Sequence, residues 1–184
     1  MKSQRQFYIT VMFAAVAILR TTWAFAGPIT FPLALTGRGS GNEIGAAGVC
    51  NGVGNTCTDT TCECYQFSGN ATLNNNIGTT LASTNFILNL SALLDNLDCL
   101  SAHGVLTLTQ KTNAQNILAL DYQGLDCLDD SSSEFVFNGA YSVDNSASKG
   151  KFAKALGSGT FTAGVQASGT ITLGNINGTL QLMP

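Results

Sequence analysis

The stretch that decides the fold is Glu134–Met183, with the sequence EFVFNGAYSVDNSASKGKFAKALGSGTFTAGVQASGTITLGNINGTLQLM. Apolar residues alternate with small polar ones through this stretch, and Gly, Asn and Ser interrupt the alternation. Antiparallel strands that bury one face and expose the other have this period of two. The stretch therefore predicts consecutive antiparallel strands. The period changes phase at Gly174–Asn175, which predicts either a β-bulge or a tight hairpin turn there.

The same alternation extends toward the N-terminus. Residues 28–36 place apolar side chains at every second position, and Pro32, which has no N–H for a ladder, predicts an edge or lead-in strand. Residues 65–73 and 86–90 predict two further strands. Residues 37–64 are rich in Gly and Cys and show no period. They predict a loop that is held by disulfide bonds.

Two strands near the middle of the chain fix their own register. Leu106 and Leu108 precede a polar turn around Asn113, and Leu118 and Leu120 follow it. If the four leucines share one face, Leu106 pairs with Leu120 and Leu108 pairs with Leu118. The same register brings two cysteines opposite each other, within reach of a disulfide. We therefore predict the bond Cys99–Cys127.

The strands number about eight and have short connections, which favours a single all-β domain over residues 27–184. Eight antiparallel strands suffice to close a small barrel that holds side chains or one small ligand. We predict a closed antiparallel β-barrel with a disulfide-held N-terminal loop. A β-sandwich is the alternative.

Residues 1–26 are typical of a signal peptide. Lys2 and Arg5 precede a short apolar run, and Ala24–Phe25–Ala26 offers small residues for cleavage. We therefore expect a secreted or periplasmic protein. Beyond residue 26 the chain has five Lys or Arg against eleven Asp or Glu, a net charge of −6. This charge argues against nucleic acid as a partner, and we expect no membrane association of the mature form.

Six cysteines in an exported chain predict three disulfide bonds. Once Cys99–Cys127 is assigned, Cys62 and Cys64 lie too close together in sequence to bond each other. The remaining choices are Cys50–Cys62 with Cys57–Cys64, or Cys50–Cys64 with Cys57–Cys62, and the spacing does not decide between them. The spacing is not that of a zinc site, and we predict no bound metal and no cofactor.

Residues 150–161, GKFAKALGSGTF, resemble a G-x-F-x-x-A-x-G-S-G-T-F stretch of exported bacterial barrel proteins related to allene oxide cyclase and dirigent barrels. The similarity covers mainly residues 135–173. It implies that Phe152 packs over a barrel end and that Gly157 and Gly159 belong to the strand that follows. Residues 145–150 depart from the double glycine usual in this family. No catalytic residue of the plant enzymes matches a position in this sequence.

Candidate ligand-binding residues are aromatic. They line a predicted apolar cavity or form ordinary core, and they are Tyr65, Phe67, Phe86, Phe135, Phe137, Tyr141 and Phe161. We single out Tyr65, Phe67, Phe137 and Tyr141. His103 shares a hairpin face with Asp121, which suits a base beside a carboxylate. A structural histidine is the plainer interpretation.

The acidic group Asp126, Asp129, Asp130 and Glu134 has the oxygen ligands that calcium prefers, but no calcium-loop pattern. We predict a solvated loop there. Taken together, these features predict an exported, disulfide-stabilised barrel that serves as a binding or surface-structural module and is not an enzyme. One alternative is a cyclase-like or dirigent-like barrel that acts on a small apolar substrate. The other is a glycan-binding surface protein. A homo-oligomer is compatible with all three hypotheses.

Overall fold

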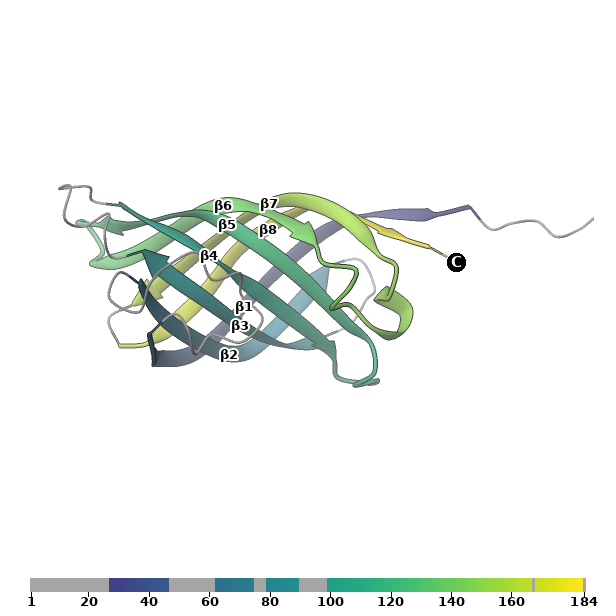
Figure 1. Ribbon diagram of the computed structural model, residues 1–184, viewed down its shortest axis with the longest axis horizontal. Helices are drawn as coiled ribbons and strands as arrows, with labels where there is room; N and C mark the ends of the chain where they lie inside the picture. Colours follow the sequence, from purple (N-terminus) through teal and green to yellow (C-terminus); the bar gives the residue numbers. More distant parts are fainter. Residues whose placement is uncertain (1–26, 47–61, 75–78, 90–98, 167, 184) are drawn as a thin grey trace, which may run out of the picture.

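A computed structural model describes residues 27–46, 62–74, 79–89, 99–166 and 168–183, with the backbone alone for residues 44–46, 62, 74 and 79–89. In these residues the chain forms eight strands that close into one antiparallel barrel (Figure 1). The strands are β1 (Ile29–Ala46), β2 (Cys62–Asn74), β3 (Thr79–Asn89), β4 (Cys99–Gln110), β5 (Ile117–Asp129), β6 (Glu134–Val143), β7 (Leu156–Gln166) and β8 (Thr170–Leu182).

The strand order is the sequence order, and β1 pairs with β8 to close the barrel. The predicted barrel is therefore confirmed, and the alternative sandwich is not what forms. One 3-10 turn, η3 (Gly150–Phe152), lies in the segment that joins β6 to β7. No helix in the described part of the chain is long and apolar enough to cross a membrane.

The alternation in the sequence separates the side chains that face the barrel interior from those that face outward. On β4, Leu106 and Leu108 are buried, while Val105 and Thr107, which alternate with them, are only half-buried. Because successive strand residues point to opposite faces, each strand sends every second side chain into the barrel. The buried apolar residues of seven strands and of the β6–β7 segment form a single core. The described interior side chains thus form mainly a hydrophobic core.

The pairing of β4 with β5 confirms the predicted register. Leu106 lies opposite Leu120, and Leu108 lies opposite Leu118. The same ladder ends with Cys99 opposite Cys127, and the two are joined by a disulfide bond. The leucine period and the cysteine positions therefore describe one hairpin consistently.

The predicted loop over residues 37–64 is wrong for residues 37–46 and for Cys62–Cys64, which begin β2. β1 runs on to Ala46, and Gly37, Gly39 and Gly41 pair with β2. Added Cβ atoms at these glycines would collide with the β2 backbone. The strand therefore continues on residues that carry no hydrophobic signal, because close approach to β2 requires glycine there. Residues 47–61 of the expected loop lie outside the described residues.

The change of phase near the C-terminus is a β-bulge. β8 is continuous, but Thr162 pairs with Asn175 while Ala163 pairs with Leu173. Gly174 is therefore the extra residue, which moves Ile176 and Leu180 to even positions while keeping them inside. The alternative hairpin turn does not form.

One end of the barrel is closed by the segment between β6 and β7. We call this the plug end, and the end with the β5–β6 and β7–β8 turns the turn end. Phe152 of η3 is 2% exposed and belongs to the core cluster, as the sequence predicted for this residue. Gly150 has a φ of +61°, and an added Cβ would collide with the Gln115 carbonyl and the Asn116 side chain. Glycine is needed there to bring the segment against the β4–β5 turn.

Candidate functional site

The larger of two described hollows is a groove on the outer wall of the barrel. It has a volume of about 990 Å³ and lies over β4, β5 and the end of β6. Its lining residues are Ser101, Ala102, His103, Gly104, Val105, Asp121, Tyr122, Gln123, Gly124, Leu125, Ala140, Tyr141, Ser142 and Asp144. The groove is partly open, neither an enclosed cavity nor a flat surface.

The strand register decides which polar groups meet in this groove. His103 of β4 lies opposite Gln123 of β5, and Asp121 lies opposite Ser142 of β6. His103 and Asp121 share the outer face and are diagonal neighbours, a distance that long side chains can span. The sequence-based prediction that these two residues share a hairpin face is therefore confirmed.

Two carboxylates give the groove a negative potential. The pKa of Asp121 is raised by partial burial and by the nearby charge of Asp144. The pKa of Asp144 is lowered, because the Ser146 hydroxyl donates to its Oδ1 at 2.6 Å and the amides of Ser146 and Ala147 also donate to it. Of the described residues that line the groove, none is Lys or Arg. Among these lining residues, Asp121 therefore has no positively charged side chain beside it.

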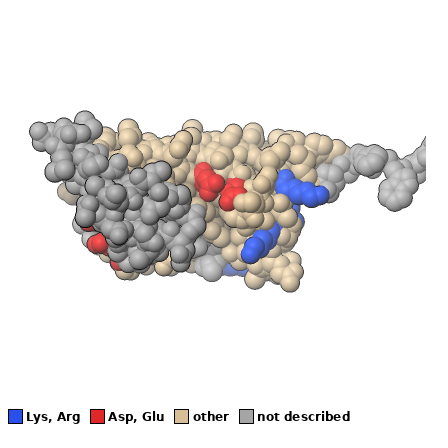
Figure 2. Space-filling model, viewed as in Figure 1, with Lys and Arg blue, Asp and Glu red and all other residues tan. Residues whose placement is uncertain are grey.

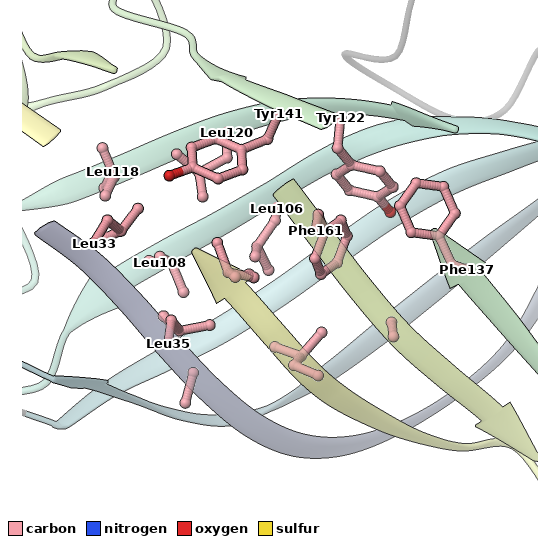
Figure 3. Packing of buried hydrophobic residues seen from close by; sticks show 14 of the residues in the cluster. Leu33, Leu35, Leu106, Leu108, Leu118, Leu120, Tyr122, Phe137, Tyr141 and Phe161 are labelled. Carbon is pink, nitrogen blue, oxygen red and sulfur yellow. The ribbon is translucent and has the colours of Figure 1, made fainter. Parts of the chain in front are cut away.

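The barrel interior offers far less room. Tyr122, Phe137 and Phe161 pack edge-to-face or tilted, with ring centroids 4.6 to 5.3 Å apart (Figure 3). Beside them, the enclosed space described in the core is about 10 Å³. A volume of this size holds about one water molecule.

Two buried polar atoms interrupt this apolar interior. Asp126 is 2% exposed, and burial raises its pKa to about 6. Its Oδ1 and the Tyr141 hydroxyl have no hydrogen-bond partner in the described part of the chain. The Tyr141 hydroxyl lies against Gly178, so that an added Cβ there would collide with it. Burial also raises the pKa of Tyr141, to about 12.

The sequence-predicted ligand residues lie on two opposite surfaces of the barrel wall. Phe67, Phe137 and Tyr141 belong to the core, and Tyr65 packs against it. The Tyr65 hydroxyl donates to Glu63 Oε2 at 2.6 Å, and burial is the main cause that raises its pKa. His103 lines the outer groove, and Tyr141 contributes to the lining of that groove as well as to the core. The five residues therefore do not form one site, and their role in ligand binding stays a prediction.

The cysteines are described only in part. Cys64 is fully buried and disulfide-bonded, and no cysteine in the described part of the chain is free. Cys50 and Cys57 lie outside the described residues, as does the side chain of Cys62. The choice between the two predicted pairings stays open.

The prediction of a solvated acidic loop is wrong for Asp126. This residue belongs to β5 and faces the interior, because it continues the even-numbered positions of Leu118, Leu120 and Tyr122. Asp129 does cap the exposed turn, where it accepts hydrogen bonds from Ser131 and Ser132. Within the described ranges no three His, Cys, Asp or Glu residues are placed to hold a metal ion.

Several groove residues were not singled out from the sequence: Ser101, Gln123, Ser142 and Asp144. Each faces outward on a strand or lies at a strand end. The apolar alternation in the sequence came from the inward residues of the same strands. A list of the outward residues in register across β4, β5 and β6 would have found them. The burial of Asp126 could also have been predicted, since Asp126 occupies an even-numbered position of β5, as the buried Leu118 and Leu120 do.

Comparison with known proteins gives no family assignment. No protein-family model, curated protein or solved structure matches this chain. A function must therefore be inferred from the groove and the interior themselves.

Proposed function

We propose that this protein is exported and acts as a non-enzymatic binding module, with the outer-wall groove as its ligand site. The observation that carries the proposal is the contrast between the two hollows. The groove measures about 990 Å³, whereas the enclosed interior space is about 10 Å³. Small-molecule sites need roughly 300 Å³ or more, and of these two described hollows the groove alone provides this much room.

Export is supported by two features of the chain. The Cys99–Cys127 disulfide and the bonded state of Cys64 suit an oxidising compartment, because cytosolic thiols are kept reduced. Residues 1–26 have the charge and apolar pattern of a signal peptide. From these features we propose that the protein is secreted or periplasmic.

The ligand that fits the groove best is a small polar cation, such as an amine. Asp121 and Asp144 supply negative charge, and Gln123 and Ser142 supply uncharged hydrogen-bonding groups. A bound cation near Asp121 would stabilise the charged form of this carboxylate. It would thereby oppose the two effects that raise the pKa of Asp121, its partial burial and the negative charge of Asp144. Glycan binding is less well supported, because the aromatic rings in the lining, Tyr122 and Tyr141, are only 5% and 3% exposed.

Calorimetric titration with spermidine tests this ligand class. Asp121→Asn should weaken spermidine binding about tenfold, since a close charge pair contributes roughly 1 to 2 kcal/mol. Asp130→Asn, an exposed carboxylate in the β5–β6 turn, is the matched control and should leave binding unchanged. Equal binding by wild type and Asp121→Asn would contradict the groove as the site. Binding should also weaken as the pH falls through the pKa of Asp121, which lies above its ordinary value of 3.8.

A second candidate is a cyclase-like or dirigent-like barrel that admits a small apolar substrate. The observation that favours it is the pair of unpartnered buried polar atoms, Asp126 Oδ1 and the Tyr141 hydroxyl. The burial of Phe152 at the barrel end agrees with the resemblance over residues 135–173. Native mass spectrometry of protein from its own host separates the two candidates. A retained apolar molecule that is lost in Asp126→Asn would favour this second candidate over the groove.

A further inference from the structure

The lysines of the barrel are gathered at one end. All four that follow residue 26 are exposed and lie at the plug end. Lys111 is in the β4–β5 turn, and Lys149, Lys151 and Lys154 are in the segment between β6 and β7. The remaining cation of this part of the sequence, Arg38, lies within β1. The positive charge is therefore concentrated on one small area.

Hydrogen bonds fix this area in place. The Lys149 amide donates to the Ile117 carbonyl at 2.8 Å, and the Lys151 amide donates to Asn116 Oδ1 at 3.0 Å. The Lys151 ammonium lies 4.9 Å from the centre of the buried Phe152 ring. The segment that carries three lysines is thus attached to the turn that follows Lys111.

Large apolar side chains are exposed at the same end. Ile29 is 56% exposed, Leu156 is 40% exposed and Met183 is 37% exposed. Ile29 pairs with Leu182, and Leu156 pairs with Gln181, so the three residues lie on adjoining strand ends. We call these three residues and the four lysines the plug-end patch.

Four of the described carboxylates lie toward the opposite end of the barrel. Glu43, Glu63, Asp129 and Glu134 are at or near the turn end. Asp144 lies at the plug end itself, where it accepts hydrogen bonds from Ser146 and Ala147, and Asp121 lies four residues into β5 from the same end. These two carboxylates are fewer than the four lysines there. In Figure 2 the blue side chains lie toward the right, and the red ones lie to their left. The net negative charge of the chain therefore does not describe the plug end.

Although the net charge of −6 led us to expect no membrane association of the mature form, we propose that the plug-end patch docks on the surface of an anionic lipid bilayer. The lysines would face the headgroups, while Ile29, Leu156 and Met183 would enter the boundary with the acyl chains. Lysines near an anionic surface contribute to the free energy of binding, and apolar side chains that enter the bilayer contribute further. Carboxylates more than about 10 Å from the membrane are largely screened at physiological salt. A soluble polyanion offers no apolar phase, so the exposed apolar residues favour the bilayer.

The test is co-sedimentation of the secreted protein, its N-terminus checked by mass spectrometry, with lipid vesicles. Vesicles that contain phosphatidylglycerol should bind it, and pure phosphatidylcholine vesicles should bind it far less. Lys149→Gln, Lys151→Gln and Lys154→Gln together should reduce binding about a hundredfold, because each lysine contributes roughly a factor of five. These side chains are exposed, so the variant should keep the circular dichroism of the wild type.

The apolar half of the patch needs its own variant. Leu156→Ser with Met183→Ser should reduce vesicle binding roughly tenfold. The matched control is Leu128→Ser, which is 43% exposed near the turn end and should leave vesicle binding unchanged. Equal binding to both kinds of vesicle would overturn the proposal. So would an unaffected Leu156/Met183 variant together with tight binding to heparin, which would identify a soluble polyanion as the partner.

Discussion

A single carboxyl group inside the barrel, that of Asp126, should control how stability depends on pH. Burial raises its pKa from the ordinary 3.8 to about 6, so the folded state prefers the protonated form. The free energy of unfolding should be highest below about pH 4 and fall as the pH rises to about 6. The loss is about 3 kcal/mol, since one pKa unit corresponds to about 1.4 kcal/mol.

Asp126→Asn should remove this dependence and raise the stability near pH 7 by about 2 kcal/mol, because the amide is neutral but still polar. Urea unfolding at pH 4.5 and 7.5, followed by circular dichroism, measures the effect. This range lies above the lowered pKa values of Asp129 and Asp144. The pKa of Asp121 is also raised, but this residue is the same in both proteins, so the difference between them reports Asp126. A variant that loses as much stability as the wild type over this range would contradict the assignment.

The Tyr141 hydroxyl should be a net cost to the fold. It is buried against Gly178 and has no hydrogen-bond partner in the described residues. Tyr141→Phe keeps the ring and removes the unsatisfied group, so the free energy of unfolding should rise by about 1 kcal/mol. Tyr65→Phe is the control with the opposite sign, because it breaks the hydrogen bond to Glu63. Thermal melts of both variants decide the question.

At the scale of elements, the β4–β5 hairpin is held at its far end by Cys99–Cys127, across a sequence separation of 28. Replacing both cysteines by alanine should lower the free energy of unfolding by about 3 kcal/mol, since the cross-link restricts the unfolded chain. The double substitution is preferable to a reducing agent, which would also attack the disulfide of Cys64. An unchanged unfolding midpoint in denaturant would show that the hairpin does not need the bond.

Phe152 should be the residue of the β6–β7 segment that matters most for stability. Its ring is buried in the core at the plug end, whereas the neighbouring Lys151 and Ala153 are exposed. Phe152→Ala should cost about 3 to 5 kcal/mol, as for other large buried aromatic side chains. Lys151→Ala is the control and should change the unfolding midpoint little. A similar effect of both substitutions would mean that Phe152 does not close the barrel end.

The elements differ in how well the sequence predicted them, and hydrophobicity explains the difference. The β4–β5 register could be predicted because Leu106, Leu108, Leu118 and Leu120 mark one face. The second half of β1 could not, because Gly37, Gly39 and Gly41 pair with β2 without an apolar side chain. The groove needs outward residues from three strands in register, and only His103 and Asp121 were placed together beforehand.

At the scale of the whole molecule, closure joins the first strand to the last. Ile29 pairs with Leu182, so contacts of the largest sequence separation complete the barrel. Folds dominated by distant pairings fold slowly, because loop entropy is lost before those contacts form. Refolding after dilution from urea should therefore take about a millisecond to a second, and stopped-flow fluorescence of the tyrosines would measure it. Completion within microseconds would contradict this expectation.

The pairing of Ile29 with Leu182 has a practical consequence. The polypeptide enters and leaves the barrel at neighbouring points on the same rim, as the purple and yellow strands of Figure 1 show. A fluorescent protein or affinity tag fused at either terminus would therefore stand over that rim and would hinder whatever the rim touches. A short glycine linker between these points, with new termini cut into the Asp129–Glu134 turn, should give a circular permutant that leaves the rim free of attached cargo.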